Sequence, residues 1–300
     1  MTPFTTPTEA CTGGLSAGNT YGFLRDGLVA QGFKVYTQPV APGGVPVPAT
    51  ANDTDGPFSN CPEQLPAALT INSIDSPELG GERMADFIGY LHDTYGVNQV
   101  DLVGHSLGGI FVRNGIRVLE QRNSPVKVRS LSTLSSPWEP VMPANPLNDP
   151  KAACDGQMVC QAFAEAMLKV PSAQAIVKAL NASEFDPWTQ QQAGVLDGIP
   201  VTLIGGAYFT KPLGNPDKWP NDGIVQLSAS LARKVPDTVI PIRSCFTEAA
   251  THSAVISKEI KDDPGTGVTW NDTSVNIIAN AVRVAGTPQQ LANRLGCPTP

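Results

Sequence analysis

A short apolar run that ends in a Gly-x-Ser-x-Gly motif constrains this chain more than any other feature. Residues 100–103 read Val-Asp-Leu-Val and predict a strand, and residues 104–108 read Gly-His-Ser-Leu-Gly. Apolar residues then recur at helical spacing over 107–121. A serine at such a junction is lifted above a sheet, beside the free N–H groups of a helix start. We therefore expect Ser106 to be a nucleophile; the alternative is a plain glycine-rich turn.

If Ser106 lies in such a strand-to-helix turn, steric crowding explains why small residues flank it. A sharp strand-to-helix turn brings the chain close to neighbouring backbone, where a side chain would not fit. We expect a β-carbon at Gly104 or at Gly108 to clash with that backbone.

Length and composition favour one domain that spans residues 1–300. A chain of this length can bury a large core, and only 16% of its residues are charged. The net charge of −7 argues against nucleic acid or an anionic membrane as the main partner. No run of 18 apolar residues occurs, so we expect no transmembrane segment. We also expect a monomer.

Six cysteines and three histidines shape the expectations about metals and disulfides. The cysteines form no Cys-x-x-Cys pair, so we expect no zinc site and no cofactor. Their even number suggests disulfides and an oxidising compartment, although six buried free thiols remain an alternative. Chain order favours the pairs Cys11–Cys61, Cys154–Cys160 and Cys245–Cys297. Because no signal peptide is visible at the start, a secreted protein would be present in its mature form.

Periodicity and capping residues predict alternating helices and strands. The expected helices cover residues 24–31, 77–95, 107–121, 159–168, 172–180 and 272–284. The expected strands cover residues 33–37, 100–103, 126–134, 201–204 and 239–242. This alternation predicts a doubly wound, mostly parallel α/β sheet.

Residues 139–199 interrupt the alternation of strands and helices. We expect this insertion to form a helical cap or lid beside the carboxyl ends of the strands, where such sheets bind ligands. A purely structural insertion is the alternative. Its apolar residues either line an acyl groove or pack the cap on the sheet, and they are Phe163, Met167, Leu168, Val170, Ile176, Val177 and Leu180.

A nucleophilic serine needs a base, and elimination leaves one histidine. The His105 side chain should point away from that of Ser106, because the two residues are adjacent in the chain. His92 lies at the end of the preceding helix, near the opposite end of the strand. His252 follows the last expected strand and is therefore the candidate base.

The candidate acid lies between the serine and the histidine, after a strand. Asp222 meets this requirement and would orient His252, with Asp217 as the near rival. An ordinary Asn-Asp-Gly turn is the alternative reading of Asp222. The chain order serine, acid, histidine is that of α/β-hydrolases.

An oxyanion intermediate needs two N–H donors. The backbone of Leu107 is one candidate, and the glycine-rich loop at residues 12–15 suits the other. A flexible N-terminal turn is the alternative interpretation of Gly13 and Gly14.

These residues resemble secreted bacterial lipases of the α/β-hydrolase fold, the small Bacillus lipases in particular. The resemblance covers roughly residues 12–38, 77–135 and 201–256, with breaks. Its motifs are the helix end at residues 28–33, the elbow segment at 96–109, and the segments that begin at Asp222 and His252. Counting back from residue 33 without gaps aligns residues 12–14 with the family's oxyanion loop. The resemblance therefore implies that Gly14 is the second oxyanion donor.

Two further features refine the resemblance. Residues 222–226 read Asp-Gly-Ile-Val-Gln and are similar to the acid segment of Candida B-type lipases, as is Cys245, bridged to a later cysteine. The insertions at residues 40–75 and 140–199 are absent from the small Bacillus enzymes and imply a more covered site.

The resemblance implies a secreted serine ester hydrolase, foremost a triacylglycerol lipase, that acts on acyl-ester or lipid substrates. A short-chain carboxylesterase, a polyester hydrolase or an acyltransferase would share the same fold and triad. A non-catalytic binding module on a hydrolase scaffold is a further alternative, from a different functional class.

Overall fold

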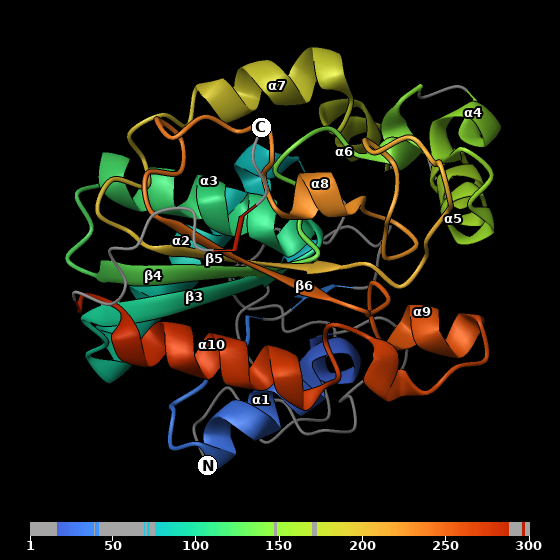
Figure 1. Ribbon diagram of the computed structural model, residues 1–300. Helices are drawn as coiled ribbons and strands as arrows, with labels where there is room; N and C mark the ends of the chain where they lie inside the picture. The colour runs from blue at the N-terminus through green and yellow to red at the C-terminus, as the bar shows by residue number, and fades with distance from the viewer. Residues whose placement is uncertain are drawn as a thin grey trace.

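A parallel sheet covered by helices on both faces makes up the centre of the computed structural model (Figure 1). The structure describes residues 17–38, 40–41, 69, 71–72, 76–146, 149–169, 173–287 and 296–297. In these residues the sheet has the order β3-β4-β5-β6, and every neighbouring pair is parallel. The fold is therefore a doubly wound α/β sheet, as the sequence predicts.

Helices and strands alternate over most of the described chain. The strands are β1 (Val40–Ala41), β2 (Ile71–Asn72), β3 (Gln99–His105), β4 (Lys127–Leu134), β5 (Val201–Gly206) and β6 (Arg243–Glu248). The α-helices are α1 (Ala17–Ala30), α2 (Pro77–Tyr95), α3 (Leu107–Gln121), α4 (Pro150–Cys154), α5 (Met158–Leu168), α6 (Gln174–Ala179), α7 (Ala182–Gln190), α8 (Leu227–Ser230), α9 (Ala254–Glu259) and α10 (Asp272–Val284). Short 3-10 turns cover Met142–Ala144 and Pro264–Thr266. The small strands β1 and β2 pair in parallel with each other.

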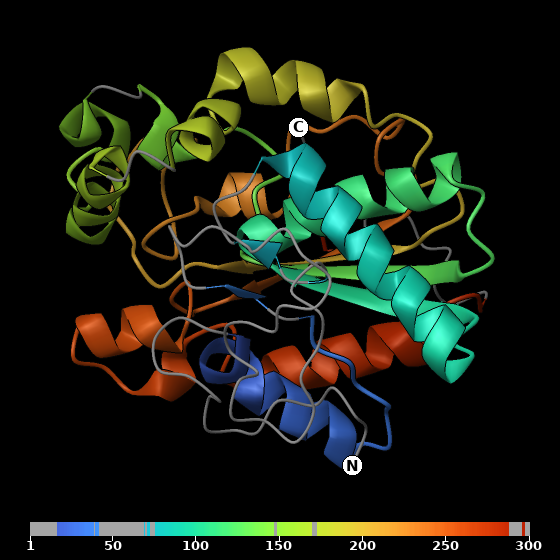
Figure 2. The same cartoon turned by 180° about the vertical axis from the view of Figure 1, so that it is seen from behind.

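The two faces of the sheet bury separate apolar clusters. Helices α2, α3, α7 and α8 lie on one face, and α1 and α10 lie on the other (Figures 1 and 2). Consecutive residues of β5 alternate between them, because Leu203 packs with the α2 and α3 side and Ile204 with the α1 and α10 side. All six residues of β5 are buried, as expected for a strand covered on both faces.

Local sequence signals set both ends of α2. The Ser76 side chain accepts a hydrogen bond from Leu79 N at the start of α2, where Pro77 is the first residue. Gly96 ends the helix with φ 66°, a left-handed conformation that glycine adopts without steric cost. Helices α2, α3 and α10 have the predicted bounds.

Two predicted strands are wrong. Residues 33–38 have no regular secondary structure, although Phe33 and Val35 do pack against the cluster of α1 and α10. Tyr36 packs instead with the cluster of Phe87 and Leu91. The final strand is β6, and the expected strand at 239–242 precedes it. Val239 and Ile240 are fully buried in a turn. Pro241 lies inside the run, and proline cannot donate to a ladder.

The insertion between β4 and β5 carries α4 to α7, and a buried arginine joins it to α3. The Arg113 guanidinium of α3 lies 4.0 Å from the ring of Trp138 and 4.7 Å from that of Trp188 in α7. Arg113 is fully buried, and its Nη2 lies 3.5 Å from Thr189 Oγ1. Cation–π contacts of this kind are strongest where water is excluded. They join the last helix of the insertion to the helix that follows Ser106.

Two of the three predicted disulfides lie in the described residues, and both are confirmed. Cys154 pairs with Cys160, and Cys245 pairs with Cys297, with Cα–Cα distances of 5.6 and 4.7 Å. The pair Cys11–Cys61 lies outside the described residues. Within the described ranges, no helix combines the length and apolarity that a membrane span requires.

Candidate active site

Ser106 lies at the junction of β3 and α3 in a conformation that few non-glycine residues adopt. Its φ of 52° and ψ of −131° place it in a strained region of backbone space. Two hydrogen bonds fix the backbone of Ser106, one at its N–H and one at its carbonyl. Ser106 N donates to Leu134 O at 3.0 Å, and Ser136 Oγ donates to Ser106 O at 2.6 Å. The end of β4 therefore holds the serine above the carboxyl edge of the sheet.

The glycines that the turn requires differ in part from the prediction. A β-carbon on Gly104 would lie 2.6 Å from Gly109 Cα, so the expected clash is confirmed there. At Gly108 the expectation is wrong, because no atom outside the local backbone lies within 4 Å of a β-carbon at that position. The second crowded residue is Gly109, whose β-carbon would overlap Ser136 Oγ. Gly108 faces open space instead.

We expect Gly109→Ala to destabilise the elbow and Gly108→Ala to be tolerated. The new methyl at Gly109 must displace Ser136 and break its bond to Ser106 O. Overpacking of this kind costs about 1–3 kcal/mol. Thermal unfolding of the two variants checks this, with Gly108→Ala as the matched control. Equal melting temperatures for both would contradict the assignment of Gly109 as the crowded position.

His252 lies between Ser106 and Asp222 at hydrogen-bonding distance from each. Its Nε2 is 3.0 Å from Ser106 Oγ, and its Nδ1 is 2.9 Å from Asp222 Oδ2. A carboxylate only accepts hydrogen bonds, so Nδ1 carries the proton and Nε2 presents a lone pair to the serine hydroxyl. The structure thus brings together the three side chains that the sequence singles out.

Asp222 is fully buried, and its two oxygens have different partners. Oδ1 accepts hydrogen bonds from Ile224 N at 2.9 Å and Val225 N at 2.7 Å, which leaves Oδ2 for His252. The backbone is joined as well, because His252 N donates to Asp222 O at 2.8 Å. The turn that favours Asn-Asp-Gly therefore also fixes the direction of the carboxylate. The rival, Asp217, instead forms ion pairs with Arg233 and Lys234.

The other two histidines are held by backbone carbonyls. His92 Nδ1 lies 2.9 Å from Val97 O, beyond the end of α2. His105 Nε2 lies 2.7 Å from the carbonyl oxygen of His252, so His105 contacts the candidate base itself. Burial, and then the neighbouring His252, lower the pKa of His105 to about 3. Sequence reasoning missed this contact, because the alternation of a strand shows that the side chain points away from Ser106 but not what it meets.

Of the two candidate oxyanion donors, only Leu107 lies in the described residues. Leu107 is the first residue of α3, where a backbone N–H has no acceptor within its own helix. It directly follows Ser106, so its N–H is available beside the serine hydroxyl. Gly14 lies outside the described residues, as do the neighbouring residues 12, 13 and 15.

The insertion contributes apolar side chains that pack with Leu107, Ile256 and the segment after Asp222. Ile176, Val177 and Leu180 are buried and pack with Ile224 and Val225, so they hold the insertion against the segment that follows Asp222. The partly buried members of this cluster include Leu107, Phe163, Met167 and Ile256. Leu168 is half-buried, and Val170 lies outside the described residues. We refer to Leu107, Phe163, Met167 and Ile256 as the apolar rim.

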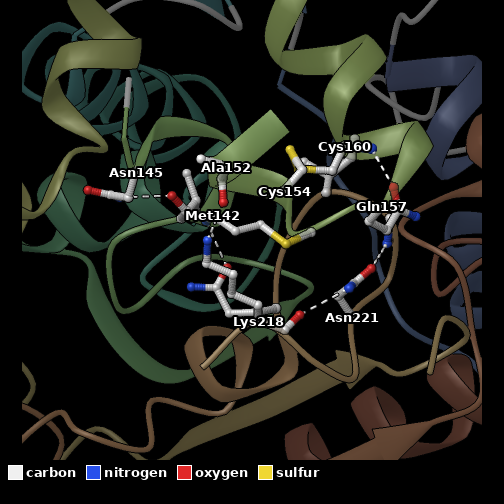
Figure 3. The surroundings of a disulfide bond; sticks show 12 residues. Met142, Asn145, Ala152, Cys154, Gln157, Cys160, Lys218 and Asn221 are labelled. Atoms are coloured by element: carbon white, nitrogen blue, oxygen red, sulfur yellow. Dashed lines mark hydrogen bonds between the residues drawn. A yellow bond between two sulfur atoms is a disulfide. The ribbon is translucent and has the colours of Figure 1, made fainter. Parts of the chain in front are cut away.

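A disulfide-closed hairpin of α4 and α5 contacts the segment that leads to Asp222 (Figure 3). Lys218 Nζ donates to Ala152 O at 2.6 Å, and Trp219 Nε1 donates to Asp155 Oδ2 at 2.8 Å. Lys211 Nζ pairs with the same carboxylate at 3.0 Å. The Lys211 and Trp219 hydrogen bonds lower the pKa of Asp155. The insertion therefore supports the loop that carries the candidate acid.

The strand order, the elbow and the chain order of the three side chains define the architecture. The fold is that of an α/β-hydrolase. No protein-family model matches the chain, and a search of curated proteins also finds no match.

Several solved structures are similar to this chain at low identity. A lipase from Bacillus licheniformis in its propeptide form is 17% identical, with a TM-score of 0.41, over 61% of this chain. The similarity covers only 38% of that lipase. The product of the lin2722 gene of Listeria innocua is 17% identical, with a TM-score of 0.45, over 74% of this chain and 72% of the other. An extracellular α/β-hydrolase from a Paenibacillus species is 12% identical, with a TM-score of 0.32, over 88% and 93% of the two chains.

Proposed function

We propose that this protein is a secreted serine ester hydrolase and that acylglycerols are its substrates. The observation that carries the proposal is the hydrogen-bonded chain from Ser106 Oγ through His252 to the buried Asp222. A serine hydroxyl becomes a strong nucleophile when a base takes its proton and a third group orients that base. The presence of all three groups argues against a non-catalytic binding module on the same scaffold.

The proposed reaction passes through an acyl-enzyme. Ser106 Oγ attacks the ester carbonyl carbon while His252 Nε2 takes the hydroxyl proton, and Asp222 stabilises the resulting imidazolium. His252 then gives that proton to the leaving alcohol oxygen as the carbon–oxygen bond breaks. A water molecule attacks the acyl carbon, again with His252 as the base. Proton return to Ser106 releases the carboxylic acid.

Backbone N–H groups would stabilise the negative charge on the carbonyl oxygen. We assign one of them to Leu107, since the start of α3 favours negative charge and the helix supplies no acceptor for this group. We assign the second to Gly14 on the basis of the family resemblance. Removing one such donor from an oxyanion site typically costs about 100- to 1,000-fold in kcat.

The apolar rim supports an acyl-ester substrate. Its members Leu107 and Ile256 lie close in sequence to Ser106 and His252, while Phe163 and Met167 come from α5 of the insertion. Partly buried apolar side chains at a catalytic edge favour a substrate with an aliphatic chain. We propose that residues 139–199 act as a cap that covers this chain. The two disulfides support secretion, because such bonds persist in oxidising compartments.

Acyl-chain dependence and active-site labelling together test the proposal. We expect a fluorophosphonate probe to label Ser106, and we expect hydrolysis of p-nitrophenyl palmitate and of emulsified long-chain triacylglycerol. Peptide mapping identifies the labelled serine. No labelling and no ester hydrolysis would overturn the proposed function.

The substrate panel separates the other acyl-ester enzymes. Activity confined to butyrate esters would identify a short-chain carboxylesterase instead of a lipase. Release of acids from a polyester film without triacylglycerol hydrolysis would identify a polyester hydrolase. Acyl transfer to an added alcohol that exceeds hydrolysis would identify an acyltransferase.

A further inference from the structure

His105 directly precedes Ser106 in the chain and lies against His252 in space. The two imidazole rings have centroids 4.6 Å apart, and both side chains are buried. His105 Nε2 lies 2.7 Å from the carbonyl oxygen of His252. His105 therefore contacts the backbone of His252, while Ser106 contacts its side chain.

The protonation state of His105 follows from this partner. A carbonyl oxygen only accepts, so His105 Nε2 carries the hydrogen and donates it. Burial and the neighbouring His252 lower its pKa to about 3, which keeps the ring neutral over the range in which His252 must act as a base. The neutral His105 ring can hold the His252 carbonyl. It adds no positive charge beside the His252 imidazole, which becomes positively charged when it takes the proton of Ser106.

The backbone of His252 is held at both of its polar groups. Its N–H donates to Asp222 O at 2.8 Å, and its carbonyl accepts from His105. The first contact comes from the acid loop after β5, and the second comes from the end of β3. His105 is the residue next to Ser106 in the elbow. Its bond to the His252 carbonyl therefore fixes the position of His252 relative to Ser106.

We propose that His105 is a positioning residue that keeps His252 Nε2 at hydrogen-bonding distance from Ser106 Oγ. It does so by donating its Nε2–H to the His252 carbonyl. The role rests on the proposed ester hydrolase function. Displacement of a catalytic group by about 1 Å can cost about 100-fold in rate. Without this donor, the loop between β6 and α9 loses the hydrogen bond that joins its backbone to the elbow.

A matched pair of variants at His105 separates the hydrogen bond from the bulk of the side chain. Glutamine and methionine have similar lengths, but only glutamine places an N–H donor near the position of Nε2. We expect His105→Met to lower kcat about 10- to 100-fold with little change in KM, because the loss is one of alignment. We expect His105→Gln to recover most of the rate. The rate of fluorophosphonate labelling of Ser106 should follow the same order.

Rates are measured on folded protein per active site, with thermal unfolding of each variant as the control for stability. If His105→Met does not fold, His105→Phe provides a ring without the donor and takes its place. Equal kcat values for the donor and non-donor variants, or a change confined to KM, would overturn the positioning role. A wild type that neither hydrolyses esters nor reacts with the probe overturns the proposed function and this role with it, whereas an active wild type with unaffected variants overturns this role alone.

Discussion

Ser106→Ala is expected to lower kcat for ester hydrolysis by about four to six orders of magnitude, to the level that substrate binding and oxyanion stabilisation alone provide. The change removes the hydroxyl that His252 Nε2 faces at 3.0 Å. Initial rates with p-nitrophenyl butyrate measure it. The fold should persist, because the backbone bonds of Ser106 to Leu134 and Ser136 do not involve its side chain.

A surface serine provides the control for Ser106. Ser183 is exposed at the start of α7, and its hydroxyl contacts only Asn181 in the described residues. We expect Ser183→Ala to keep full activity and full labelling by the fluorophosphonate probe. Ser106→Ala should lose both. Activity retained by Ser106→Ala would exclude an acyl-enzyme at this residue and with it the proposed mechanism.

Asp222→Asn is expected to lower kcat by about 10,000-fold, the size seen when a triad acid becomes an amide. The backbone donors at Ile224 and Val225 already hold one oxygen, so the amide oxygen takes that place and the NH₂ group faces His252. An NH₂ donor favours a lone pair on Nδ1, which moves the proton to Nε2. The imidazole then cannot accept the proton of Ser106. Steady-state kinetics at neutral pH measure this loss.

Two further variants sharpen the test of Asp222. Asp217→Asn should change the rate by less than about threefold, because Asp217 pairs with Arg233 and Lys234 on the surface, where single ion pairs contribute little. Asp222→Ala should also lower stability, since it leaves two buried N–H groups without an acceptor at about 1–3 kcal/mol each. Equal activity losses in Asp217→Asn and Asp222→Asn would refute the assignment of Asp222 as the acid.

Much of the fold around Ser106 could be predicted because its signals are local. Helix α2 begins at a serine cap and a proline and ends at a glycine, and these residues act on the backbone next to them. The pairings Cys154–Cys160 and Cys245–Cys297 follow chain order. His252 emerges by elimination, since a chain with three histidines leaves few choices for a base.

The features that could not be predicted depend on contacts between distant segments. The apolar run at Val239 and Ile240 resembles a strand, but tertiary packing buries it in a turn and assigns the ladder to the more polar β6. The need for glycine at position 109 arises from Ser136, which is far away in the chain. The same is true of the bond from His105 to the carbonyl of His252.

For the proposed hydrolase, the docking of the α4–α5 hairpin on the loop before Asp222 has a consequence for substrate entry. Lys211, Lys218 and Trp219 tie that loop to backbone and side-chain oxygens of the hairpin. A motion that swung the whole hairpin outward would pull on the residues that direct the Asp222 carboxylate, and would disturb the triad at the moment a substrate arrives. We therefore expect a substrate to enter through smaller movements, such as rotation of the Phe163 and Met167 side chains. For the same reason, an exchange of this insertion for that of another hydrolase would have to include the acid loop.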